Sequence, residues 1–325
     1  MHPVKTGWRQ LLGSALLSTL CAVATGATYP DKPVRMIVPF APGGGTDLVA
    51  RSLAQKLTEA LGQSFVVDNR PGANANIGNE MAARAAPDGY TLIMTSSSLT
   101  INPNLYQKLP YDPVRDFAPV SLATNVPYIL VVHPSIPVGS FQEFIAYART
   151  KPGQLSYGSA GAGNSTHLAM ELLKLVAKID LVHVPYKGTG QALTDLLGAH
   201  VQAIWGTIPP CLPHVKSGRL KGLAVGGLKR ARAVPELPTA DESGYPGYEA
   251  GSWFGLLAPA GTSKDIVAML NRAVNKALNA QELNERLNSE GAEPAGNTPE
   301  QFAAFIKMEI VKWGKVAKAA GIQRQ

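Results

Sequence analysis

The sequence predicts an α/β protein built from two domains. Three observations lead to this prediction. The chain has 325 residues, which is enough for two domains of ordinary size. Short apolar stretches typical of buried strands alternate with longer stretches that carry apolar residues at helical spacing. This alternation occurs twice, once after the N-terminal region and again in the middle of the chain, so we expect two α/β units.

The first unit begins with a β-α-β-α-β pattern. Val34–Phe40 is apolar like a buried strand, and Leu48–Leu61 carries an apolar stripe typical of a helix. Further strands are predicted at Phe65–Asp68 and Thr91–Thr95, with a Gly- and Asn-rich loop and a helix ending near Ala85 between them. Strands that alternate with helices in this way are expected to be parallel, with right-handed crossovers.

The middle of the chain repeats the alternation. The predicted strands are Tyr128–His133, Leu155–Gly158, Val182–Val184, Val201–Trp205 and Leu223–Val225. The predicted helices between them are Phe141–Thr150, Thr166–Ala177 and Gly190–Gly198. A strand at Gly251–Ala258 is then followed by predicted helices at Lys264–Leu278, Gln281–Gly291 and Pro299–Ala320. The chain is therefore expected to cross between the domains twice, near Asn125–Tyr128 and near Ala250–Phe254. One lobe would comprise residues 28–125 and 253–325, the other residues 126–252, with a ligand cleft between them.

The N-terminus has the layout of a secretory signal peptide, predicted to span residues 1–27. Lys5 and Arg9 supply the positive charge, Leu11 to Val23 is apolar, and Ala24–Ala27 is rich in small residues. The apolar run is short for a bilayer span of ~20 residues, although an uncleaved membrane anchor is the alternative. The large Leu20 before Cys21 argues against lipidation. We therefore expect a periplasmic protein.

Cysteine content and charge exclude several classes of site. Once Cys21 leaves with the leader, Cys211 stands alone, so neither an intrachain disulfide nor a Cys-based metal site is expected. The net charge is +7, and the basic residues are dispersed apart from a short cluster at 229, 230 and 232. No basic stripe interleaved with aromatic residues occurs, so no nucleic-acid partner is expected. The mild positive charge either helps to attract anions or serves only solubility.

The first candidate for a ligand site is the segment from Pro42 to Asp47, between a predicted strand and a predicted helix. Its glycines, Gly43, Gly44 and Gly45, let the backbone approach a ligand and point N–H groups at it. The helix start that follows favours negative charge, Thr46 adds a hydroxyl, and Asp47 is able to cap the helix. A tight structural turn is the alternative. The absence of a lysine after the glycines argues against a phosphate-binding P-loop.

The segment from Gly158 to His167 repeats the same arrangement in the middle of the chain. It combines a short strand, flexible glycines, hydroxyl and amide side chains, and a helix start. Two such loops, one in each lobe, would hold an anion from both sides. His167 would donate to a carboxylate or, alternatively, cap its helix. The serines at 96–98 and Lys187 would either meet the ligand or belong to solvated loops.

Signals for catalysis are scarce. The sequence contains neither a G-x-S-x-G segment nor an H-E-x-x-H segment. Its six histidines lack metal-ligand spacing. We therefore expect a binding protein without metal or cofactor. A secreted hydrolase or lyase using the same cleft remains the alternative.

Several motifs together resemble the substrate-binding receptors of tripartite tricarboxylate transporters. They are Tyr29–Arg35, Val38–Asp47, Asn69–Gly72, Ala86–Tyr90, Val184–Gly188, Gly158–Gly161 and Ser165–His167. The resemblance covers nearly the whole chain after the leader. It implies a type II periplasmic-binding-protein fold whose lobes close like a flytrap. It also implies a small carboxylate held largely by main-chain donors, and a monomer that delivers it to an inner-membrane permease or to a sensor.

The expected ligand-binding residues come mainly from the two glycine loops. They are Phe40, Pro42, Gly43, Gly44, Gly45, Thr46, Asp47, Ser97, Gly158, Ser159, Ala160, Gly161, Asn164, Ser165, Thr166, His167 and Thr207. Three segments depart from the family pattern: Ala73–Asn76, Thr189–Gln191 and Ala203–Thr207. In the last, Gly206 and Thr207 replace polar side chains near the pocket. These departures leave the identity of the ligand open.

Overall fold

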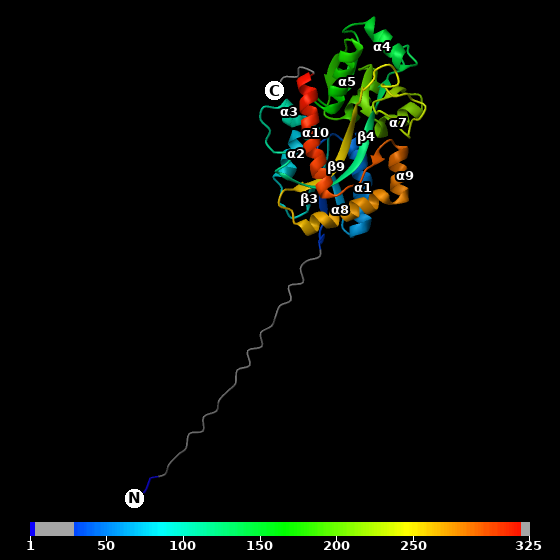
Figure 1. The fold of residues 1–325 in the computed structure, drawn as a ribbon. Coiled ribbons are helices and arrows are strands. Elements are labelled where there is room, and N and C mark those ends of the chain that lie inside the picture. Colours follow the sequence, from blue (N-terminus) through cyan, green and yellow to red (C-terminus); the bar gives the residue numbers. More distant parts are fainter. Residues whose placement is uncertain (4–28, 320–325) are drawn as a thin grey trace.

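The computed structural model describes residues 1–3 and 29–319. The predicted leader therefore lies outside the described residues apart from Met1–Pro3, as do the last six residues of the chain. Figure 1 shows a long twisted sheet with helices on its faces, in which two strands, β4 and β9, run up the middle and connect a lower with an upper part. Along the main path of the sheet the strand order is β2-β1-β3-β9-β4-β7-β5-β6.

The first half of the sheet contains the predicted β-α-β-α-β unit. Strand β1 (Val34–Val38) lies between β2 (Phe65–Asn69) and β3 (Thr91–Ser96), and both pairs are parallel as expected. Helix α1 (Gly45–Leu61) connects β1 to β2, and α2 (Asn76–Ala83) connects β2 to β3. Because parallel strands end at the same edge, the loops after β1 and β3 open at that edge of the sheet.

Strand β4 (Phe117–Val132) belongs to both halves. Its first part pairs antiparallel with β9 (Gly251–Pro259), and from Tyr128 onward it pairs with β7 (Ala203–Thr207) and β8 (Lys221–Val225). The sequence prediction started this strand only after Pro127, because proline cannot donate to a strand ladder. In the structure Pro127 lies where β4 exchanges β9 for β7, at the junction of two ladders.

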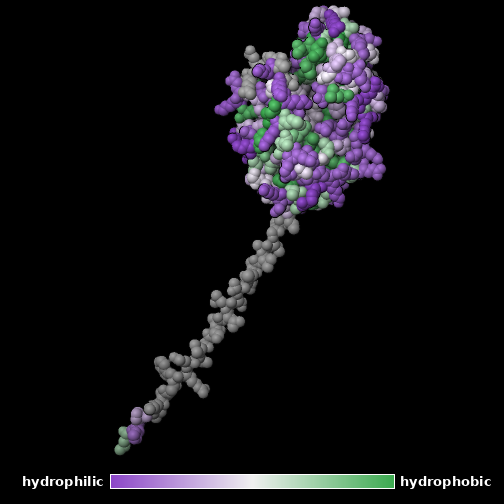
Figure 2. Space-filling model, viewed as in Figure 1, coloured by the Kyte–Doolittle hydropathy of each residue, from purple (hydrophilic) through white to green (hydrophobic). Residues whose placement is uncertain are grey.

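The second half of the sheet holds the repeated α/β pattern. Strand β5 (Ser156–Ser159) pairs in parallel with β6 (Val182–Pro185) and with β7. The helices of this half are α4 (Phe141–Arg149), α5 (Ser165–Ala177), α6 (Thr189–Leu197) and α7 (Ile208–Lys216). Figure 2 shows a mostly hydrophilic face with a hydrophobic group in the upper part, over α5. This helix exposes Leu175 and Val176.

After β9 the chain returns to the first half. It forms α8 (Lys264–Asn279), α9 (Gln281–Ser289), the short strand β10 (Glu293–Pro294), which pairs with β4, and α10 (Pro299–Ala319). Helix α3 (Ser98–Leu105), α7, β10 and the first part of β4 were not predicted from the sequence. Both missed helices contain prolines, which the sequence pattern treats as breaks. Pro209 and Pro210 stand in the first turn of α7, where the missing N–H has no helical partner to lose.

Each half has its own apolar core. In the first half, residues of α1, α8 and α9 such as Leu53, Leu270 and Leu283 share one buried cluster with the apolar residues of β1. In the second half α4 and α5 pack against β4 and β7 around Phe144 and Trp205. Among the described residues, one buried cluster joins the halves, and it is small: Ile101, Leu105, Leu168 and Ala317. No helix in the described part of the chain is long and apolar enough to cross a membrane.

Candidate functional site

The candidate site is a cavity between the two halves, where the loops after β1, β3, β5, β6 and β7 meet. Its volume is about 20 Å³. It is lined by Phe40, Gly45, Thr46, Ser96, Tyr128, Ala160, Asn164, Ser165, Thr166, Thr189, Thr207, Ser252 and Phe254. Most of these residues carry a hydroxyl group. Within the described chain, no residue that lines this cavity has a charged side chain.

Four helices begin at this cavity. The first residues of α1, α5 and α6 line it, and so does Thr207, which precedes α7. No side chain caps α1, α6 or α7 in the described structure, whereas α4 and α8, which start elsewhere, are capped by Ser140 and Ser263. Helix starts carry partial positive charge and unpaired N–H groups, so the cavity favours an anion that accepts hydrogen bonds.

The first glycine loop is held in place by the buried carboxylate of Asp47. This carboxylate accepts hydrogen bonds from Gly43 N at 2.9 Å, from Asn69 Nδ2 at 2.9 Å and from Arg51 Nε at 3.0 Å. Burial alone would raise the pKa of Asp47, but these hydrogen bonds outweigh it and lower the pKa below its ordinary value. Asp47 is therefore ionised, paired with Arg51, and turned away from the cavity it supports.

The second glycine loop is held by uncharged groups. Asn164 caps α5 by accepting from Thr166 N at 3.1 Å, and Thr166 Oγ1 in turn accepts from Ala160 N at 2.9 Å. Gly163 N donates to His167 Nδ1 at 3.0 Å. Ser159 Oγ lies 3.1 Å from Gly161 N and accepts its hydrogen bond. The two loops thus share a shape and differ in the chemistry that fixes them.

Hydroxyl groups form the rest of the lining. Tyr128 Oη is hydrogen-bonded to Ser165 Oγ, and Ser252 Oγ lies 2.8 Å from Ser97 Oγ. Burial raises the pKa of Tyr128 to about 12, so the phenol remains a neutral donor. The buried Thr207 Oγ1 has no hydrogen-bond partner among the described residues. A buried hydroxyl without a partner is costly, so a ligand atom that accepts from Thr207 would remove that cost.

The structure brings part of the predicted residue set to the cavity. The predicted residues that line it are Phe40, Gly45, Thr46, Ala160, Asn164, Ser165, Thr166 and Thr207. Those outside the lining are Pro42, Gly43, Gly44, Asp47, Ser97, Gly158, Ser159, Gly161 and His167. Three residues of the second group contact the loops or the lining from behind: Asp47 holds the first loop, Ser97 contacts Ser252, and His167 holds Gly163.

Five lining residues were not in the predicted set: Ser96, Tyr128, Thr189, Ser252 and Phe254. The serines at 96–98 were candidates in the sequence, but Ser97, one residue away from Ser96, was the predicted ligand contact. Tyr128, Ser252 and Phe254 lie at the two predicted crossings between the domains. Their position could have identified them as lining residues, because chain segments that connect two lobes also border the cleft between them.

The two halves touch each other around the cavity. Ala41 N donates to the carbonyl of Lys187 at 3.2 Å, and Asn164 Nδ2 donates to Ser98 Oγ at 2.8 Å. A Cβ atom added to Gly190 would lie 2.7 Å from the carbonyl oxygen of Pro42, so this approach requires glycine. A cavity of about 20 Å³ holds roughly one water molecule. This volume does not accommodate a molecule with several carbon atoms.

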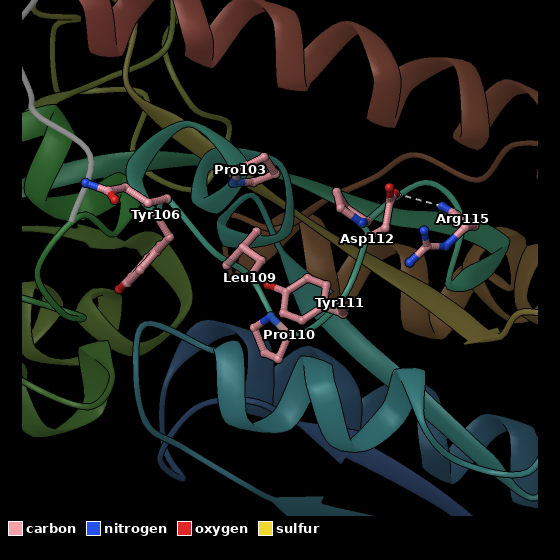
Figure 3. A pocket seen from close by; sticks show the side chains of 9 residues that line it. Pro103, Tyr106, Leu109, Pro110, Tyr111, Asp112 and Arg115 are labelled. Atoms are coloured by element: carbon pink, nitrogen blue, oxygen red, sulfur yellow. Dashed lines mark hydrogen bonds between the residues drawn. The ribbon is translucent and has the colours of Figure 1, made fainter.

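Two larger hollows lie elsewhere. Figure 3 shows one of about 400 Å³, formed entirely by residues 103–115, in which the carboxylate of Asp112 accepts from the backbone N–H of Arg115. The Arg115 side chain is paired with Asp116. The other hollow, about 800 Å³, is an open groove beside the crossing strands, next to Pro127, Trp253 and Trp313. Neither hollow is lined by the glycine loops.

Comparison with known proteins gives a consistent result. The model of the tripartite tricarboxylate transporter family receptor matches residues 49–322. The protein BugT of Bordetella pertussis is 40% identical over 304 residues, covering 93% of each chain. A structure of an R. palustris protein with adipate is 39% identical with a TM-score of 0.89, covering 91% of this chain and 100% of that one.

A second solved structure, of MatC from Rhodopseudomonas palustris with bound malate, is 36% identical. Its TM-score is 0.83, and the match covers 89% of this chain and 99% of that one. The expected architecture, that of the solute-binding proteins of this family, is thereby confirmed. Family and fold are those of periplasmic binding proteins and not of enzymes. On these grounds the chain belongs to the tripartite tricarboxylate transporter receptor family.

Proposed function

We propose that this receptor captures a small carboxylate-bearing molecule in the cavity between its halves and delivers it to an inner-membrane permease. The observation that carries the proposal is the convergence of helix starts on a cavity lined by hydroxyls. Helices α1, α5, α6 and α7 all begin there, and the lining residues of the described chain carry no charge. Such a site stabilises an anion through oriented N–H and O–H donors, without a fixed cation.

The related structures with adipate and malate support a dicarboxylate as the ligand. A second carboxylate, at the far end of such a molecule, would accept from the neutral hydroxyls of the lining. Among these donors Thr207 Oγ1 is the first candidate, because it is buried without a partner among the described residues. The enzyme alternative predicts conversion of the ligand, whereas a receptor returns it unchanged.

Capture would proceed by closure of two lobes, residues 28–125 with 253–325 and residues 126–252. Support comes from the separate cores of the halves and from the two strands, β4 and β9, that connect them. The small volume of the cavity also supports closure, because a ligand would enter only when the halves are apart. Small-angle scattering should show a smaller radius of gyration with saturating ligand. An unchanged radius would argue against closure.

A thermal-shift screen tests the binding function. Mono-, di- and aromatic carboxylates are compared with the uncharged amides of the same carbon skeletons, adipate against adipamide among them. A ligand that binds only the folded protein raises the melting temperature, and the shift grows with the logarithm of its concentration relative to the dissociation constant. We expect stabilisation by at least one dicarboxylate and none by its diamide. Equal shifts with acid and amide, or no shift in the whole series, would contradict an anion site.

Export belongs to the same proposal. Family members are periplasmic proteins, and we propose that the leader is removed between Ala24 and Thr28 to release a soluble monomer. Intact-mass analysis of periplasmic material decides this, because an uncut or lipid-modified chain has a different mass. Light scattering on the same sample checks the monomer. If the receptor serves a sensor protein instead of a permease, its deletion should abolish a transcriptional response to the ligand and leave uptake of the ligand unchanged.

A further inference from the structure

Two histidines lie stacked behind the second glycine loop. The rings of His167, on α5, and His183, on β6, are nearly parallel, with centroids 3.9 Å apart and an angle of 17° between their planes. Tyr157, on β5, lies close to both rings, with its centroid 5.0 Å from that of His183 and 6.4 Å from that of His167. Neither histidine lines the cavity. The stack is therefore placed to act on the loop and not directly on a ligand.

Each histidine makes one hydrogen bond to the loop. His167 Nδ1 accepts from Gly163 N at 3.0 Å, and His183 Nε2 lies 2.6 Å from Ser159 Oγ. The same Ser159 hydroxyl accepts from Gly161 N. The pair thus fixes the loop at both ends of the segment that supplies Ala160 to the cavity lining. Gly161 and Gly163 have positive φ angles of 142° and 73°, so the segment has little conformational preference of its own to hold it there.

The bond from Gly163 requires an uncharged His167. Nδ1 accepts a hydrogen bond only when it carries no proton, so neutral His167 has its proton on Nε2. Protonation would place an N–H on Nδ1, facing the N–H of Gly163, and this hydrogen bond would be lost. Two protonated rings 3.9 Å apart would also repel each other.

The charged groups around the stack come from α5. Glu171 Oε1 lies 3.9 Å from His167 Nε2 and accepts hydrogen bonds from Tyr157 Oη at 2.5 Å and from Lys174 Nζ at 2.9 Å. Burial lowers the pKa of His167, and Lys174 adds to this while Glu171 opposes it. Burial, together with the neighbouring His167, lowers the pKa of His183 to about 4. Both rings are therefore neutral at pH 7.

We propose that His167 and His183 are positioning residues whose neutral stack holds the second glycine loop in its binding shape, so that acidification releases the ligand. The inference rests on the proposed function and adds a pH dependence to it. It does not require either imidazole to touch the ligand. An imidazolium that instead served as a charge partner for the carboxylate would strengthen binding in acid, which is the opposite sign.

The first test needs no ligand. In the full mature protein with ¹⁵N-labelled histidine, NMR should show His167 protonated on Nε2 and unprotonated on Nδ1 at pH 7. Its titration midpoint should lie below the ordinary value of 6.5. The amide of Gly163 should be protected from exchange at pH 7 and lose protection as His167 titrates. Protonation on Nδ1 at pH 7, or a Gly163 amide indifferent to that titration, would overturn the proposal.

The second test separates the hydrogen bond from packing, with adipate as the probe in calorimetric titrations at pH 7.5 and 4.5. In His167→Asn the amide oxygen replaces Nδ1 as an acceptor and does not titrate. In His167→Phe the ring is kept and the acceptor is lost. Between pH 7.5 and pH 4.5, the affinity of the wild type should fall about tenfold more than the affinity of His167→Asn falls over the same range. His167→Phe should bind about tenfold more weakly at both pH values.

The control is His133→Asn, which alters a histidine whose Nδ1 is bonded to Ser135 Oγ in an exposed turn. It should behave like the wild type at both pH values. Protonation of adipate itself affects all four proteins equally and cancels in the comparison. Parallel losses in the wild type and His167→Asn, or full affinity in His167→Phe, would overturn the proposal. If the wild type binds no carboxylate at all, the proposed function fails, and the NMR test still decides the role of the stack.

Discussion

The two glycine loops use one backbone design and two kinds of support. Each follows a parallel strand, β1 or β5, and each leads into a helix whose first residues line the cavity. The first loop is tied to the ionised carboxylate of Asp47, whereas the second is tied to neutral imidazole, hydroxyl and amide groups. A helix start can therefore be positioned by a charge or by neutral groups. The difference appears only when pH or a single side chain is changed.

The largest effect is expected from Gly45→Val, at the start of α1. A Cβ atom on Gly45 would lie 2.5 Å from Thr207 Oγ1 and 3.1 Å from Phe254 Cζ. The added side chain would fill the cavity and keep the halves apart, so ligand affinity should fall by about a hundredfold. The control is Gly44→Ala, because a Cβ there meets its nearest neighbour at 3.7 Å. Calorimetry on both variants checks this, and similar affinities would show that the contact at Gly45 is adaptable.

The charged support of the first loop is tested by Asp47→Asn. The substitution removes the charge that Arg51 and the Gly43 N–H share, and hydrogen bonds to a buried charged group are worth about 2 kcal/mol. We expect a loss of about that size in the free energy of unfolding, measured with urea. Glu59→Gln on the same helix breaks an ion pair of a half-exposed carboxylate and should change stability by less than about 0.5 kcal/mol. Equal losses would mean that the Asp47 network contributes no more than a surface pair.

The neutral support of the second loop makes stability fall in mild acid. In the folded protein burial, and then the neighbouring His167, lowers the pKa of His183 to about 4, whereas an unfolded histidine titrates near 6.5. Between these values the unfolded chain binds more protons, so the free energy of unfolding decreases as pH falls from 6.5 toward 4. A loss of about 1–2 kcal/mol is expected at pH 5.

The first loop should not contribute to that loss. The pKa of Asp47 is lowered, so its stabilisation is complete above the ordinary value of 3.8 and is lost only as pH falls below it. Urea unfolding of wild type and His183→Gln between pH 7 and 4.5 measures the contribution of the second loop. A pH profile unaffected by the substitution would assign the acid sensitivity to another region.

A smaller effect is expected from Thr207→Val, which removes a hydroxyl of the cavity lining that lies next to Gly45. If this hydroxyl donates to the ligand, affinity should fall about fivefold to tenfold, with no loss of stability in the free protein. Thr124 is a matched control, because its Oγ1 is also buried without a partner among the described residues and does not line the cavity. Thr124→Val should leave affinity unchanged. Equal effects of the two variants would remove Thr207 from the ligand's contacts.

The smallest effect is expected from Lys187→Ala. Lys187 contributes its carbonyl to the contact with Ala41, and its exposed side chain does not line the cavity. Affinity should change by less than about twofold, since neither loop relies on its ammonium group. Calorimetry at low and at moderate salt provides the measurement. A tenfold loss would show that the site uses a cation in addition to the helix starts.

Much of the fold could be predicted from sequence because its signals are local. Apolar runs and helical stripes located β1, α1, β2, α5 and α8 to within a few residues. The elements that were missed depend on distant partners. The first part of β4 is a strand because β9 pairs with it, and α3 and α7 contain prolines that a local pattern treats as breaks.

The candidate site was likewise predictable from the sequence only in part. Glycines before a helix are visible in a sequence, and they led to both loops and to Gly45, Thr46, Ser165 and Thr166 at the cavity. Whether a residue faces the cavity or supports it from behind depends on side-chain direction and on what lies across the gap. Spacing alone could not separate Ser96 from Ser97, since neighbouring residues point in different directions at the end of a strand.

The sequence by itself indicated two alternating α/β patterns, predicted a leader at the N-terminus and located the two glycine loops, because composition, periodicity and glycine placement are local properties. Tertiary structure decided which groups converge. It set His167 against His183, which is distant in sequence, and it brought Thr207 to Gly45 across the gap between the halves. The physical reason is that hydrogen bonds, burial and pKa depend on neighbours in space. Those neighbours become known only once β4 and β9 have joined the two halves around one cavity.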